Sequence, residues 1–177
     1  VLEVRPDALD AFEAVILPGP VHLSEEWGKR LDGYVEKGGK LIVTQEAYVE
    51  AGPTANPVVL QSLGVEAIVN RRESMRSAYF ELAPSEVFEE LDGLDVTFLD
   101  GPYRYVELST TAVGMMPLIP PHMYGPPEKC YYTQITENPG LISNAYGQGA
   151  TAYMPWNIGD LYNTHQWHGH RRVFAAV

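Results

Sequence analysis

A strand–helix–strand unit near the N-terminus places the strongest constraint on what this chain can fold into. Residues 14–17 (AVIL) and 41–44 (LIVT) are short apolar runs rich in β-branched side chains, as in parallel strands that are covered on both faces. Between them, Ser24 is the predicted N-cap of an amphipathic helix that ends at Gly38 and Gly39. Two such strands joined by one helix form a βαβ unit with a right-handed crossover.

The second part of the chain has a different pattern, in which short extended segments replace the helical periodicity. A proline-rich loop, residues 117–129, is followed by two β runs, residues 141–146 and 150–154, which flank the tripeptide GQG at residues 147–149. Because a short glycine-containing loop between two strands makes a hairpin, we expect these runs to pair. A phosphate-binding glycine loop would have to open a helix instead, so this motif does not predict a nucleotide site.

Charge and cysteine content limit the partners and the structural sites that this chain can have. The chain contains 12 Lys or Arg and 23 Asp or Glu, and its formal net charge of −11 argues against nucleic acid and anionic membranes as partners. Cys130 is the single cysteine, so neither a disulfide framework nor a cysteine-rich zinc site is predicted. No apolar run reaches the roughly 18 residues of a membrane span. We therefore expect a soluble protein without a cofactor, and a cytoplasmic location is favoured.

The length of 177 residues fits a single domain, residues 1–177, and both ends look cut. The sequence starts without Met inside a predicted strand and stops within a predicted helix, at HRRVFAAV. We therefore expect one domain that belongs to a longer multidomain chain.

Two blocks of sequence carry a resemblance to a known family. The first, AVILPGPVHLSEEWGKRLDGYVEKGGKLIVT at residues 14–44, resembles the class I glutamine-amidotransferase-like domain found behind the catalytic barrel of family 42 type β-galactosidases, often called the trimerisation domain. The second, PPEKCYYTQITENPGLISNAYGQGATAYMPWNIGDLYNTHQWHGHRRVFAAV at residues 126–177, is similar to the end of that domain in a subgroup attached to poorly characterised glycoside hydrolases. Together the two blocks cover about half of the 177 residues.

The resemblance implies a fold for the whole chain. It implies an α/β, flavodoxin-like, mostly parallel sheet flanked by helices, with an added β-rich portion and a hairpin in the second half. The first strand and helix of the usual domain would then precede Val1.

The nucleophile of an active relative is missing from the sequence. A glutamine amidotransferase needs a cysteine on a strained turn between a strand and a helix, activated by a histidine that a glutamate orients. In this chain the turn would follow residues 41–44, where Thr44, Gln45 and Glu46 stand instead of a cysteine. Cys130 lies more than 80 residues further along. We therefore predict a vestigial elbow and no catalytic residue in this domain.

Several residues of the last third are candidates for binding or for an interface. Aromatic rings with a polar tip suit both sugar faces and protein surfaces. The candidates are Tyr131, Tyr132, Trp156, Asp160, Tyr162 and Trp167. His165 and His168 are weak metal candidates because they could share one helical face, but Gly169 disfavours a continuous helix and no carboxylate follows at ligand spacing. No metal site is therefore predicted.

The resemblance and the missing nucleophile together predict a support role. We expect a non-catalytic domain of a β-galactosidase-like glycoside hydrolase, which promotes homo-oligomer assembly and contacts the catalytic barrel of the same chain. A carbohydrate-binding or sugar-utilisation domain of the trehalose-utilisation type is the first alternative, with carbohydrate as its ligand. A free-standing hydrolase with an unrecognised catalytic triad is the second.

Overall fold

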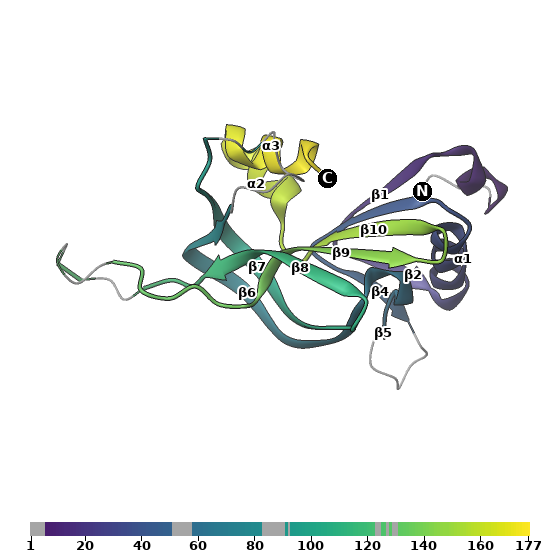
Figure 1. Cartoon of the computed structure of the whole chain (residues 1–177), viewed down its shortest axis with the longest axis horizontal. Coiled ribbons are helices and arrows are strands. Elements are labelled where there is room, and N and C mark those ends of the chain that lie inside the picture. Colours follow the sequence, from purple (N-terminus) through teal and green to yellow (C-terminus); the bar gives the residue numbers. More distant parts are fainter. Residues whose placement is uncertain are drawn as a thin grey trace.

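The structure is a computed structural model that describes residues 6–50, 58–82, 91, 93–122, 125–126, 128 and 131–177. It contains a seven-stranded sheet in the order β1-β3-β10-β9-β8-β6-β7 and a three-stranded sheet in the order β2-β4-β5 (Figure 1). The strands are β1 (Ala14–Pro18), β2 (Val21–Ser24), β3 (Lys40–Thr44), β4 (Ala47–Glu50), β5 (Val58–Val59), β6 (Val65–Glu81), β7 (Val96–Leu108), β8 (Ala112–Ile119), β9 (Pro139–Tyr146) and β10 (Gly149–Met154). The helices are α1 (Glu25–Glu36), α2 (Ile158–His165) and α3 (His168–Ala175), with short 3-10 helices at Pro6–Ala11 and Gln61–Leu63.

The predicted βαβ unit is confirmed. β1 and β3 pair in parallel, and α1 lies between them in the sequence. Ser24 caps α1, because its hydroxyl accepts a hydrogen bond from the Trp27 amide at 3.3 Å. The helix buries Leu31, Tyr34 and Val35 against the parallel strands, so the apolar stripe read from the sequence faces the core.

The expected flavodoxin-like, mostly parallel sheet is wrong. Of the seven strands in the large sheet, β1, β3 and β10 run parallel, whereas β9, β8, β6 and β7 continue the sheet in antiparallel pairs. The described residues contain three α-helices, and α2 and α3 lie together on one side of the strand-rich body instead of flanking a parallel sheet (Figure 1).

The physical reason is the chain that follows β3. It forms long extended runs that fold back on one another, and such runs pair antiparallel without a helical crossover. Register shifts between β6 and β7 act as bulges, which increase the local twist and curl this part of the sheet.

The predicted hairpin at residues 147–149 is confirmed, and its glycines serve packing. β9 and β10 pair antiparallel around this turn. The turn meets the C-terminal end of α1, where the Gln148 amide donates to the Glu36 carbonyl at 2.9 Å. A β-carbon at Gly149 would overlap the carbonyl oxygen of Val35. The loop therefore faces the negative end of a helix dipole, which is the wrong end for binding a phosphate.

Replacing Gly149 with alanine tests this packing. The new methyl group would overlap the Val35 carbonyl, so we expect the free energy of unfolding to fall by about 1–3 kcal/mol. Gly33→Ala is the matched control, because a β-carbon there meets no atom within 4 Å and α1 should gain about 0.5–1 kcal/mol from a better helix former. Urea unfolding measures both variants, and equal stability of the two would show that the hairpin is free to move away from α1.

Candidate functional site

The turn after β3 lies at the carboxyl ends of the parallel strands and has an unusual backbone. Gln45 has a φ of 61°, and across it the Glu46 amide donates to the Thr44 carbonyl at 2.8 Å. A three-residue turn of this kind is rare and strained. The Gln45 amide donates to the carbonyls of Met154 and Trp156, at 2.8 and 3.0 Å, so the chain at the end of β10 holds the turn in place. A glutamine thus occupies the position at which the resemblance predicts a vestigial elbow.

Glu46, directly after this turn, is a buried carboxylate that binds two arginines. Its side chain is 1% exposed. Its Oε2 accepts a hydrogen bond from Arg104 Nε at 2.6 Å, and its Oε1 accepts one from Arg71 Nε at 3.0 Å. The Arg104 side chain, which is 5% exposed, also pairs with Glu73 at 3.1 Å. Two carboxylates and two guanidinium groups therefore balance their charges at this corner.

Burial and charge act in opposite directions on Arg104. Burial disfavours its charged form, but the hydrogen bonds and negative charges of Glu46 and Glu73 outweigh burial and raise the pKa of Arg104. The guanidinium group thus stays charged beside Glu46. Because each oxygen of Glu46 already accepts a charge-assisted hydrogen bond, this carboxylate is not placed to act as a general base or a nucleophile.

The same network joins the two halves of the large sheet. Glu46 follows β3 in the parallel half, whereas Arg71 lies on β6 and Arg104 on β7 in the antiparallel half. The Arg104 amide also donates to the Pro155 carbonyl, just beyond β10, at 2.8 Å. The side-chain network at this corner therefore links the curled antiparallel strands β6 and β7 to the end of the parallel strand β3.

Sequence reasoning named Glu46 but missed its partners. Arg71, Glu73 and Arg104 come from strands that lie 25 to 58 residues beyond Glu46. The available signal was a cation between two aromatic residues, Tyr103 and Tyr105, since a charge that such neighbours bury needs a buried partner.

The other residues of the predicted elbow are also buried. Thr44 is 5% exposed, and its hydroxyl accepts a hydrogen bond from the Gly19 amide at 3.2 Å. Gln45 is 8% exposed, and its carbonyl accepts a hydrogen bond from the Tyr153 hydroxyl at 2.9 Å. Cys130 lies outside the described residues.

The aromatic candidates divide between the core and the surface. Trp156 is completely buried, and its Nε1 donates to the Gly140 carbonyl at 2.7 Å, so it is a core residue here. Asp160 is exposed in the first turn of α2. The exposed rings, in order of decreasing exposure from 60% to 38%, are those of Tyr131, Tyr132, Tyr162 and Trp167.

The two weak metal candidates fall in different helices. α2 ends at His165, α3 begins at His168, and Gln166, with a φ of 50°, breaks the helix between them. Within the described part of the chain, no group of three or more His, Cys, Asp or Glu side chains is arranged to hold a metal ion.

His170 on α3 is a buried histidine that sequence reasoning did not single out. It is 0% exposed, and its Nε2 lies 2.8 Å from the Phe98 carbonyl, which can only accept a hydrogen bond. The ring centroids of Trp156 and Trp167 lie 5.7 and 5.8 Å away. Burial lowers the pKa of His170, even though the bond to Phe98 acts in the opposite direction. The ring is therefore neutral at pH 7, with its proton on Nε2.

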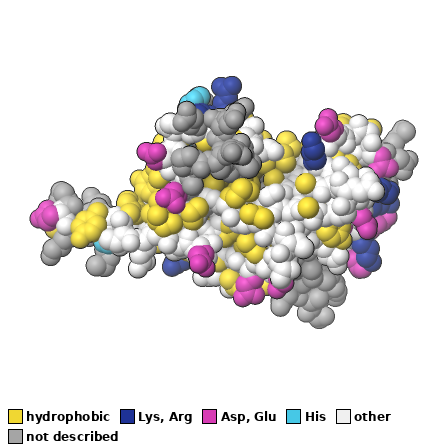
Figure 2. Space-filling view, viewed as in Figure 1, with side chains coloured by type: hydrophobic (Ala, Val, Ile, Leu, Met, Phe, Trp, Pro, Cys, Tyr) yellow, Lys and Arg dark blue, Asp and Glu magenta, His cyan; other side chains and the backbone are white. Residues whose placement is uncertain are grey.

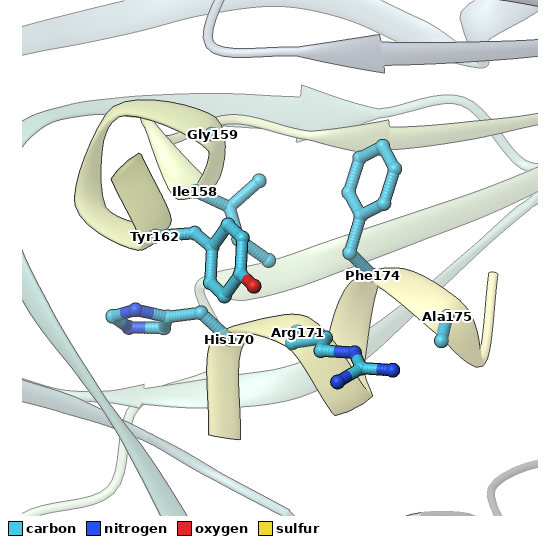
Figure 3. Close-up of a pocket in the computed structure, with 7 residues that line it drawn as sticks. All are labelled: Ile158, Gly159, Tyr162, His170, Arg171, Phe174 and Ala175. Atoms are coloured by element: carbon cyan, nitrogen blue, oxygen red, sulfur yellow. The ribbon is translucent and has the colours of Figure 1, made fainter. Parts of the chain in front are cut away.

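A pocket of about 270 Å³ lies between α2 and α3 (Figure 3). Ile158, Gly159 and Tyr162 line it from α2, and Arg171 and Phe174 are among the residues that line it from α3. The aromatic and aliphatic side chains dominate this lining, which leaves few polar groups to orient a ligand. We call it the α2–α3 pocket.

Comparison with known proteins connects the chain with glycoside hydrolases. It is 26% identical over 159 residues to the β-galactosidase BbgII of Bifidobacterium bifidum, and the match covers 90% of this chain and 22% of that enzyme. Its fold is similar to that of a β-galactosidase from Rahnella sp. R3, with a TM-score of 0.61, 18% identity, and coverage of 94% of this chain and 22% of the other.

A smaller protein has a similar fold. Cytoplasmic Protein STM3548 from Salmonella typhimurium matches with a TM-score of 0.60 and 16% identity, over 97% of this chain and 72% of that one. No family model matches the sequence. The chain thus spans about a fifth of the length of the β-galactosidases that it resembles. None of the helices in the described part is both long enough and apolar enough to cross a membrane.

Replacing Glu46 with glutamine tests the buried network. The variant leaves Arg104 buried without its nearest anion, so we expect a loss of about 3–5 kcal/mol in the free energy of unfolding. Glu73→Gln is the matched control at the same arginine, and because the Glu73 side chain is 70% exposed it should cost less than about 1 kcal/mol. Chemical denaturation distinguishes the two. A loss below about 1 kcal/mol for Glu46→Gln would mean that water reaches the corner.

The neutral state of His170 predicts a pH dependence of stability. The pKa of His170 lies below the ordinary value of about 6.5. As the pH falls below that value, the imidazole is therefore protonated in the unfolded chain before it is protonated in the folded chain. The corresponding stabilisation is therefore present above about pH 6.5 and is lost as the pH falls.

Two histidine variants isolate this effect. His170→Gln removes the titrating group, so its unfolding temperature should fall less than that of the wild type between about pH 7.5 and pH 5.5. His168→Gln, at an exposed position of the same helix, should follow the wild type. Thermal unfolding at both pH values is the measurement, and parallel curves for all three proteins would contradict a buried neutral His170.

Proposed function

We propose that this chain is a non-catalytic support domain of a β-galactosidase-like glycoside hydrolase, which promotes homo-oligomer assembly and rests against the catalytic barrel. The observation that carries the proposal is the match to a β-galactosidase over 90% of this chain and only 22% of that enzyme. A segment of that relative size supplies part of an enzyme rather than the whole of it. We propose that the chain assembles in the manner of the trimerisation domain, which its sequence resembles.

The corner at Glu46 supports a structural role. Gln45 stands on the strained turn where an active amidotransferase would carry a cysteine. Both oxygens of Glu46 are bound to arginines, and the Thr44 hydroxyl accepts a hydrogen bond from a backbone amide. The groups that this turn presents are therefore engaged in holding the fold together.

The edge of the large sheet supports the view that the domain extends further. Among the described strands, β1 pairs with β3 alone, so its outer edge carries no partner strand. Ile16 on β1 is 48% exposed and the nearby Phe12 is 56% exposed. Apolar side chains on an open strand edge favour the addition of another strand. The strand and helix that the resemblance implies before Val1 would pair and pack at this edge.

The exposed rings of Tyr162 and Trp167 favour a second candidate, a carbohydrate-binding or sugar-utilisation domain. Such rings can stack on the apolar face of a sugar. Sugar recognition also needs several converging hydrogen-bonding groups, whereas the adjacent α2–α3 pocket offers mainly apolar side chains. The support role therefore has the stronger physical basis.

Activity and binding measurements on the purified chain test these candidates. We expect no hydrolysis of nitrophenyl glycosides or glutamine and no saturable response of tryptophan fluorescence to galactose or lactose. Turnover that co-purifies with the chain, and that is absent from a Glu46→Gln preparation, would overturn the non-catalytic proposal. Saturable sugar binding that is lost in Tyr162→Ala would favour the second candidate instead.

A further inference from the structure

A second pocket, of about 290 Å³, lies where the N-terminal segment meets the carboxyl end of α1. Asp10, Phe12 and Glu13 line it from the N-terminal segment, and Lys37, which directly follows α1, is among the residues that line it from the helix. Its volume lies just below the roughly 300–1,000 Å³ of small-molecule sites, so it suits a ligand with a single ring. We call it the N-terminal pocket.

The walls of the N-terminal pocket are held by bonds to buried parts of the fold. Leu9 is 7% exposed and belongs to the hydrophobic core around α1. The Tyr34 hydroxyl donates to the Phe12 carbonyl at 2.9 Å, and the Lys40 amide donates to the Glu13 carbonyl at 3.3 Å. The N-terminal segment is therefore fixed against α1 and β3 without a ligand, which lowers the entropy that binding must cost.

Two carboxylates of the lining are directed toward the same buried group. Tyr34 also lines the N-terminal pocket, although it is only 5% exposed. Burial raises the pKa of the Tyr34 hydroxyl, and the negative charges of Asp10 and Glu13 act in the same direction. Both carboxylates thus lie close enough to this hydroxyl for their charges to affect it.

The lining combines an apolar ring with hydrogen-bonding groups. Phe12 is 56% exposed, so one face of its ring is open to a ligand. The carboxylates of Asp10 and Glu13 can only accept hydrogen bonds, and the ammonium group of Lys37 can only donate them. The α2–α3 pocket, whose lining is mainly apolar, lacks such a combination.

The charges around the N-terminal pocket balance one another. Glu13 pairs with Lys40 at 3.6 Å, and Lys37 provides a second ammonium group beside Asp10 and Glu13. Figure 2 shows acidic and basic side chains interspersed at the end of the molecule that carries α1. An ion would therefore meet little net attraction, and an apolar ligand would strip water from charged groups without replacing it. A neutral ligand with hydroxyl groups beside an apolar face avoids both costs.

We propose that the N-terminal pocket binds the pyranose ring of a neutral sugar, whose C–H face stacks on Phe12. The sugar hydroxyls donate to the carboxylates of Asp10 and Glu13 and accept from the ammonium group of Lys37. This ligand site goes beyond the proposed support role and does not depend on it.

A titration followed by NMR tests the site. Methyl β-galactopyranoside, added to the ¹⁵N-labelled chain, should shift the amide signals of Lys37, Gly38 and Gly39 saturably, with a dissociation constant in the millimolar range. Sorbitol carries hydroxyl groups but no ring face, so it should cause no saturable shift. Tryptophan fluorescence would miss this binding, because Trp27 stands ten residues before Lys37, about 15 Å away along the axis of α1.

Three variants examine the contacts of the sugar. Phe12→Ala removes the stacking ring and should weaken binding at least about tenfold, while the main-chain bond between Tyr34 and the Phe12 carbonyl stays in place. Glu13→Gln replaces a charged acceptor by a neutral one and should weaken binding about threefold or more. Ile16→Ala is the matched control, because it truncates a similarly exposed apolar side chain on β1, outside the lining, and should leave the affinity unchanged.

The outcomes separate this inference from the proposed function. A chain without a saturable shift, or one that binds sorbitol equally well, would overturn the site and leave the support role intact. Shifts that survive Phe12→Ala and centre on Ile158 and Tyr162 would also overturn it, by placing the sugar at the α2–α3 pocket. An equal loss of affinity in Phe12→Ala and Ile16→Ala would show that the effect is not local to the pocket, with the same consequence. Turnover of glycosides by the chain would overturn the non-catalytic proposal without affecting this site.

Discussion

The buried ion pair between Glu46 and Arg104 is the interaction on which the rest of the structure depends. An unpaired charge at either position would cost several kcal/mol, so each side chain requires the other to be in place. Glu46 is fixed by the strained turn at Gln45, and Arg104 is fixed by its backbone bond to the Pro155 carbonyl. The backbone pairs of β10, β9 and β8 already connect the parallel strands to β6 and β7, and this ion pair adds a direct side-chain link across the curled sheet.

The position of this pair bears on whether this edge of the sheet can bind a ligand. In open sheets with parallel strands, ligands bind at the carboxyl ends of the strands, and the turn after β3 lies at that edge. Here the polar side chains at this edge bind one another, since both oxygens of Glu46 accept hydrogen bonds from arginines.

Local signals predicted local structure well. Hydrophobic periodicity and the Ser24 cap located α1, and the glycine turn at residues 147–149 located the β9–β10 hairpin. The antiparallel remainder of the sheet was not predictable in this way, because the register of β6 against β7 is set by contacts across long sequence separations. The residues that meet at the candidate site are likewise brought together across long sequence separations. Arg104 lies 58 residues from Glu46, and the Phe98 carbonyl lies 72 residues from His170.

A double-mutant cycle between Glu46 and Arg104 tests the account most directly. The free energies of unfolding of the wild type, Glu46→Gln, Arg104→Gln and the double variant give the energy of interaction between the two side chains. If this pair holds the two halves of the sheet together, the interaction energy should exceed about 2 kcal/mol, since buried networks couple their members strongly. Losses that add to within about 0.5 kcal/mol would show that the two side chains act independently, and would contradict the account.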